Sequence, residues 1–407
     1  MNVLDYPSTF SLELTAACNN RCPGCSNVYA NSRPAAWSPA SQWQAWLAQF
    51  APEAVQLRLT GGEPTLHPEF GEILAAAAGY DAWVTVFTNG RWLDPDVLLN
   101  KFQSTRRLAG LLVSMHGANA NAHEAFSRVP GSFDQTLKNI RKAIDHGLRV
   151  ALSTVLTRQS IPEIEDVVGM AQDLGVSHVA FNRYLGQPLP EIEPAPADFL
   201  GAIGRIEQLI RAGHAITYGV GVPQCYQINS SEGCLAGAAY VSIDPWGSVR
   251  PCAHSPSVVG SLQVESLHSI WHGSPMAAWR SRLPQECLEC ALFARCHGGC
   301  RAVPEILSEG RDPLRFDPIK ITAVSSAPVT KRLPGWIKPL PVFRLRPEEF
   351  GYSVIGRGRI IAVTAAACRV LEACDGNITF ASLADQFGQA GLNLLGELWE
   401  KGMLIAA

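Results

Sequence analysis

The sequence lacks any run of eighteen apolar residues, so no segment is expected to cross a membrane as a helix. Its first ten residues, MNVLDYPSTF, have neither the basic stretch nor the apolar stretch of a targeting peptide. We therefore predict a cytoplasmic protein that does not contact a membrane.

An excess of charge of either sign is also missing. Lys and Arg together number 33 and Asp and Glu 36, which gives a formal net charge of -3. Such a balance provides little attraction for phosphates, so we expect no nucleic acid as partner. With 47% hydrophobic residues, the 407-residue chain has ample apolar material for packed cores, which excludes disorder as its main state.

Cysteine is absent from residues 26 to 224, although the chain holds twelve cysteines in all. In a reducing cytosol, cysteines grouped in this way are more often metal ligands or catalytic groups than disulfides. They form three groups: Cys18, Cys22 and Cys25; Cys225, Cys234, Cys252, Cys287, Cys290, Cys296 and Cys300; and Cys368 and Cys374.

The first half of the chain alternates strand-like and helix-like segments. Six β-rich runs occur at 8–15, 55–60, 82–88, 110–116, 149–157 and 176–184, and each is followed by a stretch with helical spacing, at 38–50, 69–79, 94–103, 132–147, 161–174 and 197–213. This alternation predicts a parallel sheet with right-handed crossovers, as an open barrel or a doubly wound fold.

The positions of unusual residues favour the barrel. The first cysteine group follows the first run, Gly61 to Pro64 follow the second, and Thr88-Asn89-Gly90 ends the third. In a barrel these three segments share the C-terminal rim, where such folds build active sites. We therefore predict an α/β fold with a partial (β/α)6 TIM-like barrel.

The second half predicts smaller units. Residues 216–320 have short strands and many cysteines, which suggests a subdomain whose core is supplemented by metal. Five prolines between 317 and 341 indicate a linker, and three strands and three helices are expected after it, as in a winged-helix-like module. The expected domains are 1–215, 216–320, a linker at 321–340, and 341–407.

The string CNNRCPGC spaces three thiolates as C-x3-C-x2-C, and three ligands leave one iron of an iron–sulfur cube open. Together with GGEP at 61–64, it resembles the radical S-adenosylmethionine (SAM) superfamily. The resemblance implies a 4Fe–4S cluster on Cys18, Cys22 and Cys25 with SAM at the open iron. It also implies SAM contacts from Gly61, Gly62, Glu63, Pro64, Asn89, Ser114 and Arg128.

The chain departs from the family next to the third cysteine. Relatives usually carry an aromatic residue directly before that cysteine, and here Gly24 stands in its place, so the adenine contacts are unassigned. A zinc loop or a reactive thiol pair is the competing interpretation of CNNRCPGC, but neither requires GGEP one strand later.

The second cysteine group reads C-x12-G-x4-C and then C-x2-C-x5-C-x3-C, which resembles the SPASM extension of radical SAM enzymes. The resemblance implies two auxiliary iron–sulfur clusters. One would be held by Cys225, Cys234, Cys252 and Cys300, and the other by Cys287, Cys290 and Cys296. The second cluster lacks the family's last cysteine, so an open iron or an oxygen ligand such as Asp317 is expected. A zinc ribbon is the competing interpretation.

Residues 341–407 contain LRPEEFGYSVIG, the run TAAACRVLEACDGNITFASLADQFG and the closing LWEKGMLI. These segments resemble the precursor-peptide recognition element, the fold of the peptide chaperone of pyrroloquinoline quinone biosynthesis. Such modules bind a leader peptide as an added strand. Together the resemblances imply a maturase that uses a 5'-deoxyadenosyl radical to abstract hydrogen from a ribosomally made precursor peptide. Reduction of the cluster implies an electron donor such as flavodoxin or ferredoxin.

The expected product is a cross-link or ring, and several alternatives stay open: epimerisation, backbone excision, sulfatase-maturase-like oxidation of a protein side chain, or a noncatalytic iron–sulfur scaffold that binds peptides. Sulfatase-maturating enzymes carry an aspartate base directly after the cysteine that matches Cys252. This chain has Ala253 and then His254, which makes His254 the candidate catalytic base.

Overall fold

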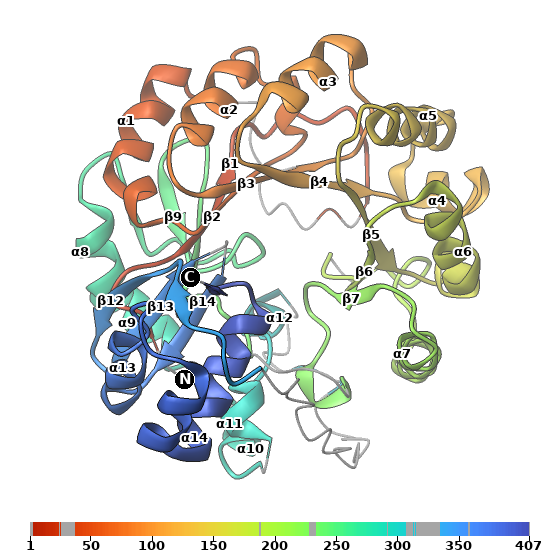
Figure 1. Cartoon of the computed structure of the whole chain (residues 1–407). Coiled ribbons are helices and arrows are strands. Elements are labelled where there is room, and N and C mark those ends of the chain that lie inside the picture. Colours follow the sequence, from red (N-terminus) through yellow and green to blue (C-terminus); the bar gives the residue numbers. More distant parts are fainter. Residues whose placement is uncertain are drawn as a thin grey trace. The chain divides into compact units, whose positions relative to one another are not determined.

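The computed structural model of the chain describes residues 3–23, 25, 37–186, 189–227, 233–290, 292–306, 312, 314, 334–356 and 359–406. These residues form two compact units (Figure 1). The first extends from Thr9 to Thr322, and the second comprises Ala323–Ala407 together with Asn2–Ser8. The first unit thus contains both the predicted barrel and the cysteine-rich region.

The first unit is built on one sheet with the strand order β10-β9-β8-β1-β2-β3-β4-β5-β6-β7. The strands from β1 to β7 are all parallel. They are β1 (Thr9–Glu13), β2 (Gln56–Thr60), β3 (Trp83–Thr88), β4 (Leu108–Ser114), β5 (Val150–Leu156), β6 (Val179–Arg183) and β7 (Ile216–Tyr218). All six predicted strands are present, and β7 extends the parallel sheet beyond them.

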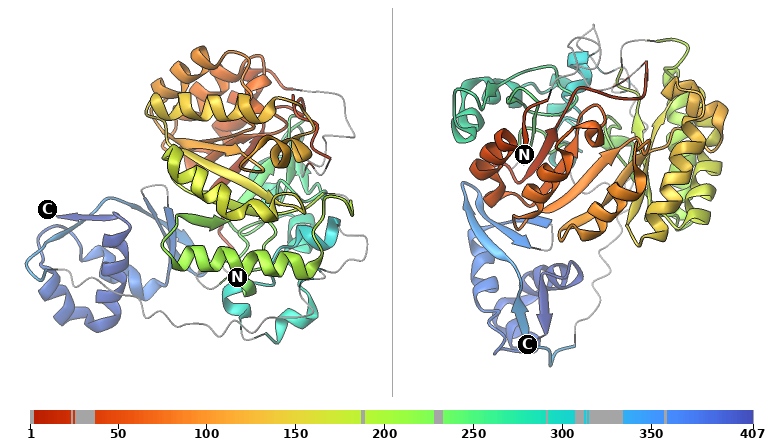
Figure 2. Two further views of the ribbon diagram at one scale, coloured as in Figure 1. Left: turned by 90° about the vertical axis from the view of Figure 1, so that its right-hand side faces the viewer. Right: turned by 90° about the horizontal axis from the view of Figure 1, so that it is seen from above.

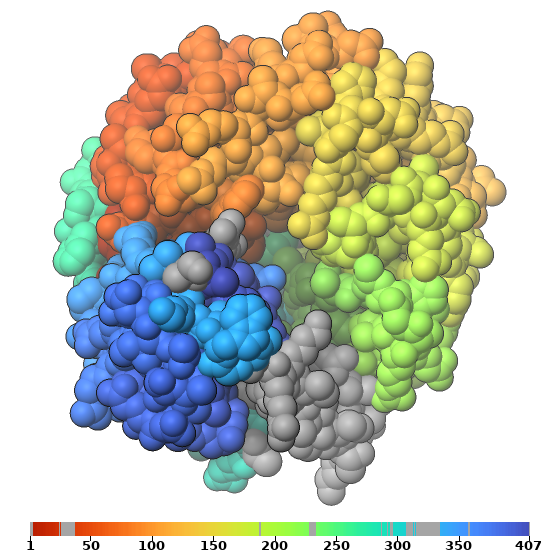
Figure 3. Space-filling model, in the orientation of Figure 1, coloured from red at the N-terminus to blue at the C-terminus, as the bar shows by residue number. Residues whose placement is uncertain are grey.

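Helices cover the outer face of the curved sheet (Figures 1 and 2), and their side chains form a continuous surface from α1 to α7 (Figure 3). They are α1 (Ala40–Phe50), α2 (Phe70–Ala78), α3 (Pro95–Ser104), α4 (Ala120–Ser127), α5 (Ser132–Asp145), α6 (Ile164–Leu174) and α7 (Pro196–Arg211). Short 3-10 helices lie at η1 (Ala51–Glu53), η2 (Pro64–Leu66) and η3 (Ile161–Glu163). All six predicted helices are present, and α4 was not predicted. Within the described ranges, no helix is both long and apolar enough to span a membrane.

Alternation along each strand explains the two faces of this sheet. Phe10 and Leu12 of β1 are fully buried, and Phe10 stacks on Phe50 of α1 with ring centroids 4.5 Å apart. Side chains at the intervening positions, such as Arg58 of β2, line a cavity on the opposite face. Successive side chains along each strand therefore point alternately to the helix-covered face and to the inner face, where a reaction can take place.

The cysteine-rich region extends the same sheet. Its strand β8 (Tyr240–Ile243) pairs in parallel with β1, and β9 (Ser248–Arg250) and β10 (Gly260–Ser261) follow in antiparallel order. The helices there are short: η4 (Gln224–Tyr226), α8 (Leu267–His272), α9 (Ser274–Arg280), α10 (Gln285–Leu288), α11 (Phe293–Cys296) and α12 (Ala302–Ile306). The region predicted as a separate subdomain is thus continuous with the main sheet.

The second unit holds two small sheets and two helices. Strands β12 (Arg344–Glu348), β13 (Gly351–Gly356) and β14 (Arg359–Val363) form an antiparallel sheet, and β11 (Pro339–Pro341) pairs with β15 (Leu404–Ala406). The helices are α13 (Ala365–Glu372) and α14 (Phe380–Glu400). Cys368 and Cys374 are buried there, as expected for apolar core residues.

Three details of this unit differ from the predictions. Residues 339 and 340 of the expected linker form part of strand β11, while 321–333 lie outside the described residues. The second and third helices expected in this module, at 380–387 and 391–402, are joined as α14, which is interrupted at Gly388 with φ 64°. The start of the chain, expected in the barrel domain, belongs to this unit: Arg346 Nη2 donates to Tyr6 O (3.0 Å), and Asp5 N donates to Glu348 Oε2 (2.7 Å).

Candidate functional site

Three predicted ligands, Cys18, Cys22 and Cys25, lie in the loop that follows β1. Cys18 and Cys25 are exposed, and the half-buried Cys22 packs against the buried cluster of Phe126, Tyr184 and Ile192. Burial raises the pKa of the Cys22 thiol, and the neighbouring Cys25 and Cys18 thiolates raise it further. The three sulfur atoms therefore lie close enough to repel one another when ionised, and bound iron would relieve that repulsion.

Two residues after β3 hold this loop. Arg91 Nη1 donates to the carbonyl of Asn19 (2.5 Å) and to Oδ1 of Asn20 (2.8 Å). Asn89 Nδ2 donates to Oδ1 of Asn19 (2.6 Å) and lies 3.7 Å from Sγ of Cys18. Asn89 was a predicted site residue, whereas Arg91 was missed. Arg91 could have been recognised as a candidate because it directly follows the Asn89-Gly90 turn.

Gly61 and Gly62 allow two loops to approach closely. Gly62 N donates to Thr15 O (2.7 Å), and a Cβ on Gly62 would lie 2.2 Å from Ala17 O. Gly61 has φ 130°, and its Cβ would lie 2.5 Å from Thr15 O. Side chains at 61 and 62 would therefore displace the segment that leads directly into Cys18.

Glu63 joins the ends of two strands. Its carboxylate is fully buried and accepts hydrogen bonds from Thr65 Oγ1 (2.6 Å), Thr88 Oγ1 (2.8 Å), Asn89 N (2.7 Å) and Thr65 N (3.2 Å). Burial raises the pKa of this carboxyl, and the hydrogen bonds oppose that effect. Glu63 therefore has a structural role that the sequence did not predict, and its contact with SAM stays a prediction.

The remaining predicted SAM contacts lie along the same edge of the sheet. Pro64 is buried at the start of η2, and Ser114 is the last residue of β4. Arg128 is exposed and left-handed (φ 55°, ψ 31°), at the end of α4. Arg21 N donates to Ser127 O (2.9 Å), which joins the end of α4 to the cysteine loop. The structure thus brings the predicted residues from Cys18 to Arg128 to the C-terminal ends of β1 to β4.

This donor set fits an iron–sulfur cluster. Soft thiolates at C-x3-C-x2-C spacing, two of them exposed, leave room for one open iron. A cluster takes its thiolates on separate irons, so they need not converge on one point. Among the described residues, no group of three His, Cys, Asp or Glu side chains is placed to hold a single metal ion.

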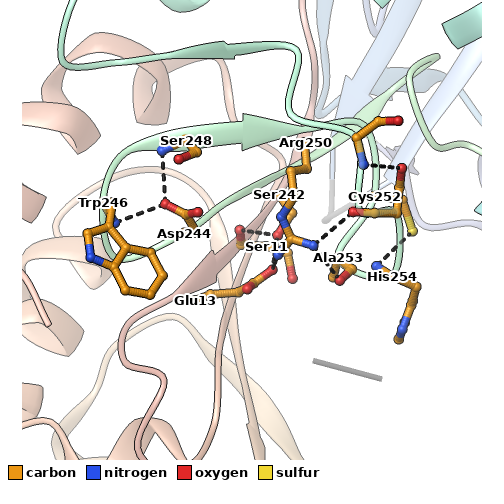
Figure 4. Close-up of polar contacts among 12 residues, drawn as sticks. Ser11, Glu13, Ser242, Asp244, Trp246, Ser248, Arg250, Cys252, Ala253 and His254 are labelled. Carbon is orange, nitrogen blue, oxygen red and sulfur yellow. Dashed lines mark hydrogen bonds and ion pairs between the residues drawn. The ribbon is translucent and has the colours of Figure 1, made fainter. Parts of the chain in front are cut away.

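A buried ion pair organises the turn that carries Cys252 (Figure 4). The Arg250 guanidinium is fully buried and pairs with Glu13 of β1. Arg250 Nη1 also donates to the carbonyls of Ala253 (2.8 Å) and Ser255 (3.0 Å). This network, which the sequence did not reveal, fixes the backbone on both sides of Cys252 against β1, an interior strand of the sheet.

His254 lies beside this network (Figure 4). Its main-chain N–H lies 3.4 Å from Cys252 Sγ, and within the described part of the chain its Nδ1 has no hydrogen-bond partner. Burial, and after it the Arg250 charge, lowers the pKa of His254 to about 4, so its imidazole is neutral at pH 7. A neutral imidazole is able to accept a proton, and the role as catalytic base stays a prediction.

The other predicted cluster ligands fall into two neighbourhoods. Cys234 and Cys252 pack together against Trp279. Cys225 lies in η4, which contacts α11, the helix that ends at Cys296. The two neighbourhoods adjoin, because a Cβ on Gly233 would lie 2.8 Å from Cys296 O. The grouping of Cys225 with Cys234, Cys252 and Cys300 that the resemblance implies stays a prediction. The alternative oxygen ligand, Asp317, lies outside the described residues.

A cavity of about 600 Å³ lies within the first unit. Its walls are inward-facing strand residues such as Arg58, Asn182 and Tyr240, and part of its lining is formed by Cys234, Cys252 and Cys300. The Arg58 guanidinium lies over the Tyr240 ring, 5.4 Å from its centroid. The cavity therefore joins the inner face of the sheet to three of the predicted auxiliary ligands.

Two family matches agree with this arrangement. Residues 12–171 match the Radical SAM superfamily, and residues 234–296 match SPASM, an iron–sulfur cluster-binding domain. These ranges contain the first cysteine loop with GGEP and most of the second cysteine group.

Among curated relatives, the chain is similar to the AdoMet-dependent heme synthase of Methanosarcina barkeri (26% identity; 73% of this chain, 91% of that protein). It is also similar to the subtilosin biosynthesis protein AlbA of Bacillus subtilis (28%; 74% and 68%). A third relative is the PqqA peptide cyclase of Ruegeria pomeroyi (26%; 79% and 91%).

The fold is similar to that of Streptococcus suis SuiB, solved bound to its precursor peptide SuiA. The TM-score is 0.65 with 18% sequence identity, over 77% of this chain and 76% of that one. The α/β fold, the cysteine loop and both domain matches agree. The chain is therefore a radical SAM enzyme that carries a SPASM iron–sulfur cluster-binding domain.

Proposed function

We propose that this enzyme modifies a ribosomally made precursor peptide and that the product is a cross-link or a ring. One observation carries the proposal. The cysteine loop is held against the GGEP segment at the C-terminal ends of the strands, and the inner face of the same sheet lines a large cavity. The names of two relatives, a bacteriocin biosynthesis protein and a peptide cyclase, support a peptide as substrate.

In this proposal the curved sheet is a partial (β/α)6 barrel with the reaction inside it. Cys18, Cys22 and Cys25 hold the first cluster, while Asn89 and Arg91 fix the loop that carries them. The cluster and SAM, when bound, supply a 5'-deoxyadenosyl radical that abstracts a hydrogen atom from an unreactive carbon of the peptide. The strand side chains that line the cavity shield the reacting carbon from water.

We propose the SAM contacts from the places that these residues occupy in the fold. Gly61, Gly62, Pro64, Ser114 and Arg128 lie on the edge that also carries the cysteine loop. Arg128 is a non-glycine residue with left-handed backbone angles, a strained conformation that is often retained where a side chain must be aimed. We assign its guanidinium to the SAM carboxylate.

We assign leader-peptide recognition to the second unit, as a winged-helix-like module. In the described sheet order β12-β13-β14, the outer strands β12 and β14 each offer one edge to an added strand. We propose that exposed arginines of this unit, Arg344 and Arg359, attract an acidic leader. Arg346 is instead committed to Glu348 (2.8 Å), and Arg357 lies outside the described residues.

A second candidate is a small metabolite as substrate, which the name heme synthase of one relative favours. Both reactions need electrons, for which we propose flavodoxin or ferredoxin as donor, and both fit a cytoplasmic enzyme. The oxidation carried out by sulfatase-maturating enzymes is less favoured because Ala253 replaces their aspartate.

Anaerobic incubation of the reconstituted enzyme with dithionite and SAM tests the proposal. We expect 5'-deoxyadenosine from the unaltered enzyme and none from a variant with Cys18, Cys22 and Cys25 all changed to Ala. Adding the precursor peptide encoded beside the gene should couple SAM cleavage to a change in peptide mass. SAM cleavage with an unchanged peptide mass would favour the small-molecule alternative.

A further inference from the structure

A smaller cavity, of about 320 Å³, lies where β5 and β6 end and α7 begins (Figure 1). Arg158 follows β5, Arg183 is the last residue of β6, and Pro196 is the first residue of α7. The cavity shares no lining residue with the one of about 600 Å³ on the inner face of the sheet. It therefore forms a separate site near the C-terminal ends of the strands.

The turn that carries Glu193 forms one wall of this cavity and is held by the loop after β5. Arg158 N donates to Ile192 O (2.9 Å), and Arg158 Nε donates to Glu193 O (2.9 Å). Gln159 Nε2 donates to Glu191 O (2.8 Å). Three lining residues are prolines, in which φ is fixed: Pro190, Pro194 and Pro196. The wall is thus formed before a ligand arrives, which lowers the entropy cost of binding.

The carboxylate on this cavity belongs to Glu193. Within the described part of the chain, this half-buried carboxylate forms no hydrogen bond and no ion pair. Burial raises the pKa of Glu193, and the Arg183 charge opposes that effect. Arg183 is itself neutralised by the buried Asp312, to which its Nη1 donates (2.8 Å). The negative charge that is left over on this cavity attracts a cation.

Aromatic rings stand close to that carboxylate. Tyr184 and Phe199 are buried and line the cavity. Burial raises the pKa of Tyr184 to about 12, and the Glu193 charge adds to that effect, so the two side chains are neighbours. Aromatic faces beside a carboxylate suit an ammonium or guanidinium group, and the prolines suit the apolar stem that carries such a group.

Tyr184 also connects the cavity to the first cysteine loop. Its ring meets that of Phe126 edge to face, with centroids 6.4 Å apart. Both rings belong to the buried cluster against which Cys22 packs. A group bound in the cavity is therefore held close to the loop that carries Cys22.

We infer that this cavity binds a basic side chain, lysine or arginine, of the peptide substrate, with Glu193 as its counter-ion. The apolar stem lies against the prolines and the two aromatic rings, and the charged end reaches the Glu193 carboxylate. In taking the cation from a peptide, the inference rests on the proposed function, whereas the binding of a basic side chain does not depend on it.

The competing ligand is an acidic side chain bound to Arg158. The Arg158 side chain is exposed and already donates through Nε to the Glu193 carbonyl. Water solvates the rest of an exposed guanidinium, so it gains little from a new partner. The half-buried Glu193 carboxylate gains more, and the structure therefore favours a cation.

Ligand-observed NMR titrations of the full-length reconstituted enzyme test the site with two probes, Nα-acetyl-lysinamide and Nα-acetyl-norleucinamide, which lacks the ammonium group. The lysine compound should bind about tenfold more tightly, as for one charge-assisted contact. Glu193→Gln should remove this difference. Glu191→Gln should keep it, because Glu191 is exposed in the same turn but does not line the cavity. Equal affinities for the unaltered enzyme would refute the cation site.

Two further arms keep the test independent of the folding of Glu193→Gln. Ala195→Phe fills the cavity without changing a charge and should abolish the binding of the lysine compound. Unchanged binding by that variant would place the compound elsewhere and overturn the assignment. Tighter binding of Nα-acetyl-glutamic acid α-amide than of the lysine compound, lost in Arg158→Gln, would assign the cavity to an acidic side chain and also overturn it.

The source of the cation is tested with the precursor peptide. Glu193→Gln should raise the KM for the peptide about tenfold relative to Glu191→Gln, because it removes a contact that binds substrate. Each Lys and Arg of the peptide is then replaced by Gln in turn, and one replacement should make the enzyme insensitive to Glu193→Gln. If no replacement does so, the peptide part of the inference is wrong. If the peptide is not modified at all, the proposed function fails, and the result with the lysine compound still decides the cation site.

Discussion

The main-chain N–H of Asn89 donates a hydrogen bond of 2.7 Å to Oε2 of Glu63, which ties the end of β3 to the loop after β2. The same carboxylate also accepts from Thr65 and Thr88. Glu63→Gln would place an amide NH2 against one of these donors and leave it unsatisfied. We expect a loss of about 1–3 kcal/mol in the free energy of unfolding.

Thermal unfolding of the reconstituted protein, followed by circular dichroism, measures this loss. Glu72→Gln is the matched control, because Glu72 is exposed on α2 and should change stability little. Equal stability of the two variants would show that the Glu63 charge does not hold the strand ends together.

Arg91 should govern how firmly the first cluster is held, because its guanidinium fixes the backbone at Asn19 and Asn20. Arg91→Gln should lower the iron retained by the Cys18 loop and reduce SAM cleavage about tenfold, while auxiliary iron is unchanged. Iron analysis after a chelator challenge gives the readout. The exposed Arg141 of α5 provides the control as Arg141→Gln, and loop iron retained by both variants alike would remove Arg91 from this role.

Stability should fall below neutral pH because of two buried histidines. His116 and His123 stack with centroids 5.7 Å apart, and His116 N donates to Nδ1 of His123 (3.2 Å). Burial lowers the pKa of His116 to about 3 and that of His123 to about 4. Below about pH 6.5, the two histidines therefore bind protons in the unfolded chain but stay neutral in the folded chain. Unfolding is favoured as the pH falls.

Each histidine should contribute up to about 1.4 kcal/mol per pH unit below 6.5, and neither should affect stability above pH 7. His123→Asn keeps an acceptor for His116 N and should reduce the slope between pH 6.5 and 5.5. His268→Asn, on an exposed histidine of α8, should not. Urea denaturation at several pH values measures the slope, and an unchanged slope in His123→Asn would contradict the assignment.

The first residues of the chain should stabilise the second unit. Asp5 donates its main-chain N–H to Glu348, so Asp5→Ala keeps the contact and Asp5→Pro removes it. We expect faster hydrogen exchange in β12 for Asp5→Pro alone, equivalent to about 1 kcal/mol, and weaker binding of the precursor peptide. SAM cleavage without peptide should be equal in both variants. Identical exchange in Asp5→Ala and Asp5→Pro would show that the segment contributes nothing.

The sequence was sufficient to predict the repeated elements and the first cluster. Strand periods of two and helix periods near 3.6 located the strands from β1 to β6 and every α-helix between them except α4, because each follows from local residue order. The loop of Cys18, Cys22 and Cys25 was equally visible, since all three ligands lie within eight residues.

Long-range pairing was not predictable in this way. Nothing local shows that β8 pairs with β1, that Glu13 meets Arg250 or that Tyr6 contacts Arg346. The neighbour of Cys225 depends on the packing of η4 against α11, and motif spacing contains no information on that contact.

The most direct test of the central claim is transfer of deuterium from the peptide. The enzyme, SAM and dithionite are incubated anaerobically with the precursor peptide carrying deuterium at all carbon-bound positions, and 5'-deoxyadenosine is analysed by mass spectrometry. The account predicts 5'-deoxyadenosine one mass unit heavier, together with a peptide of altered mass. Unlabelled 5'-deoxyadenosine and an unaltered peptide would contradict it.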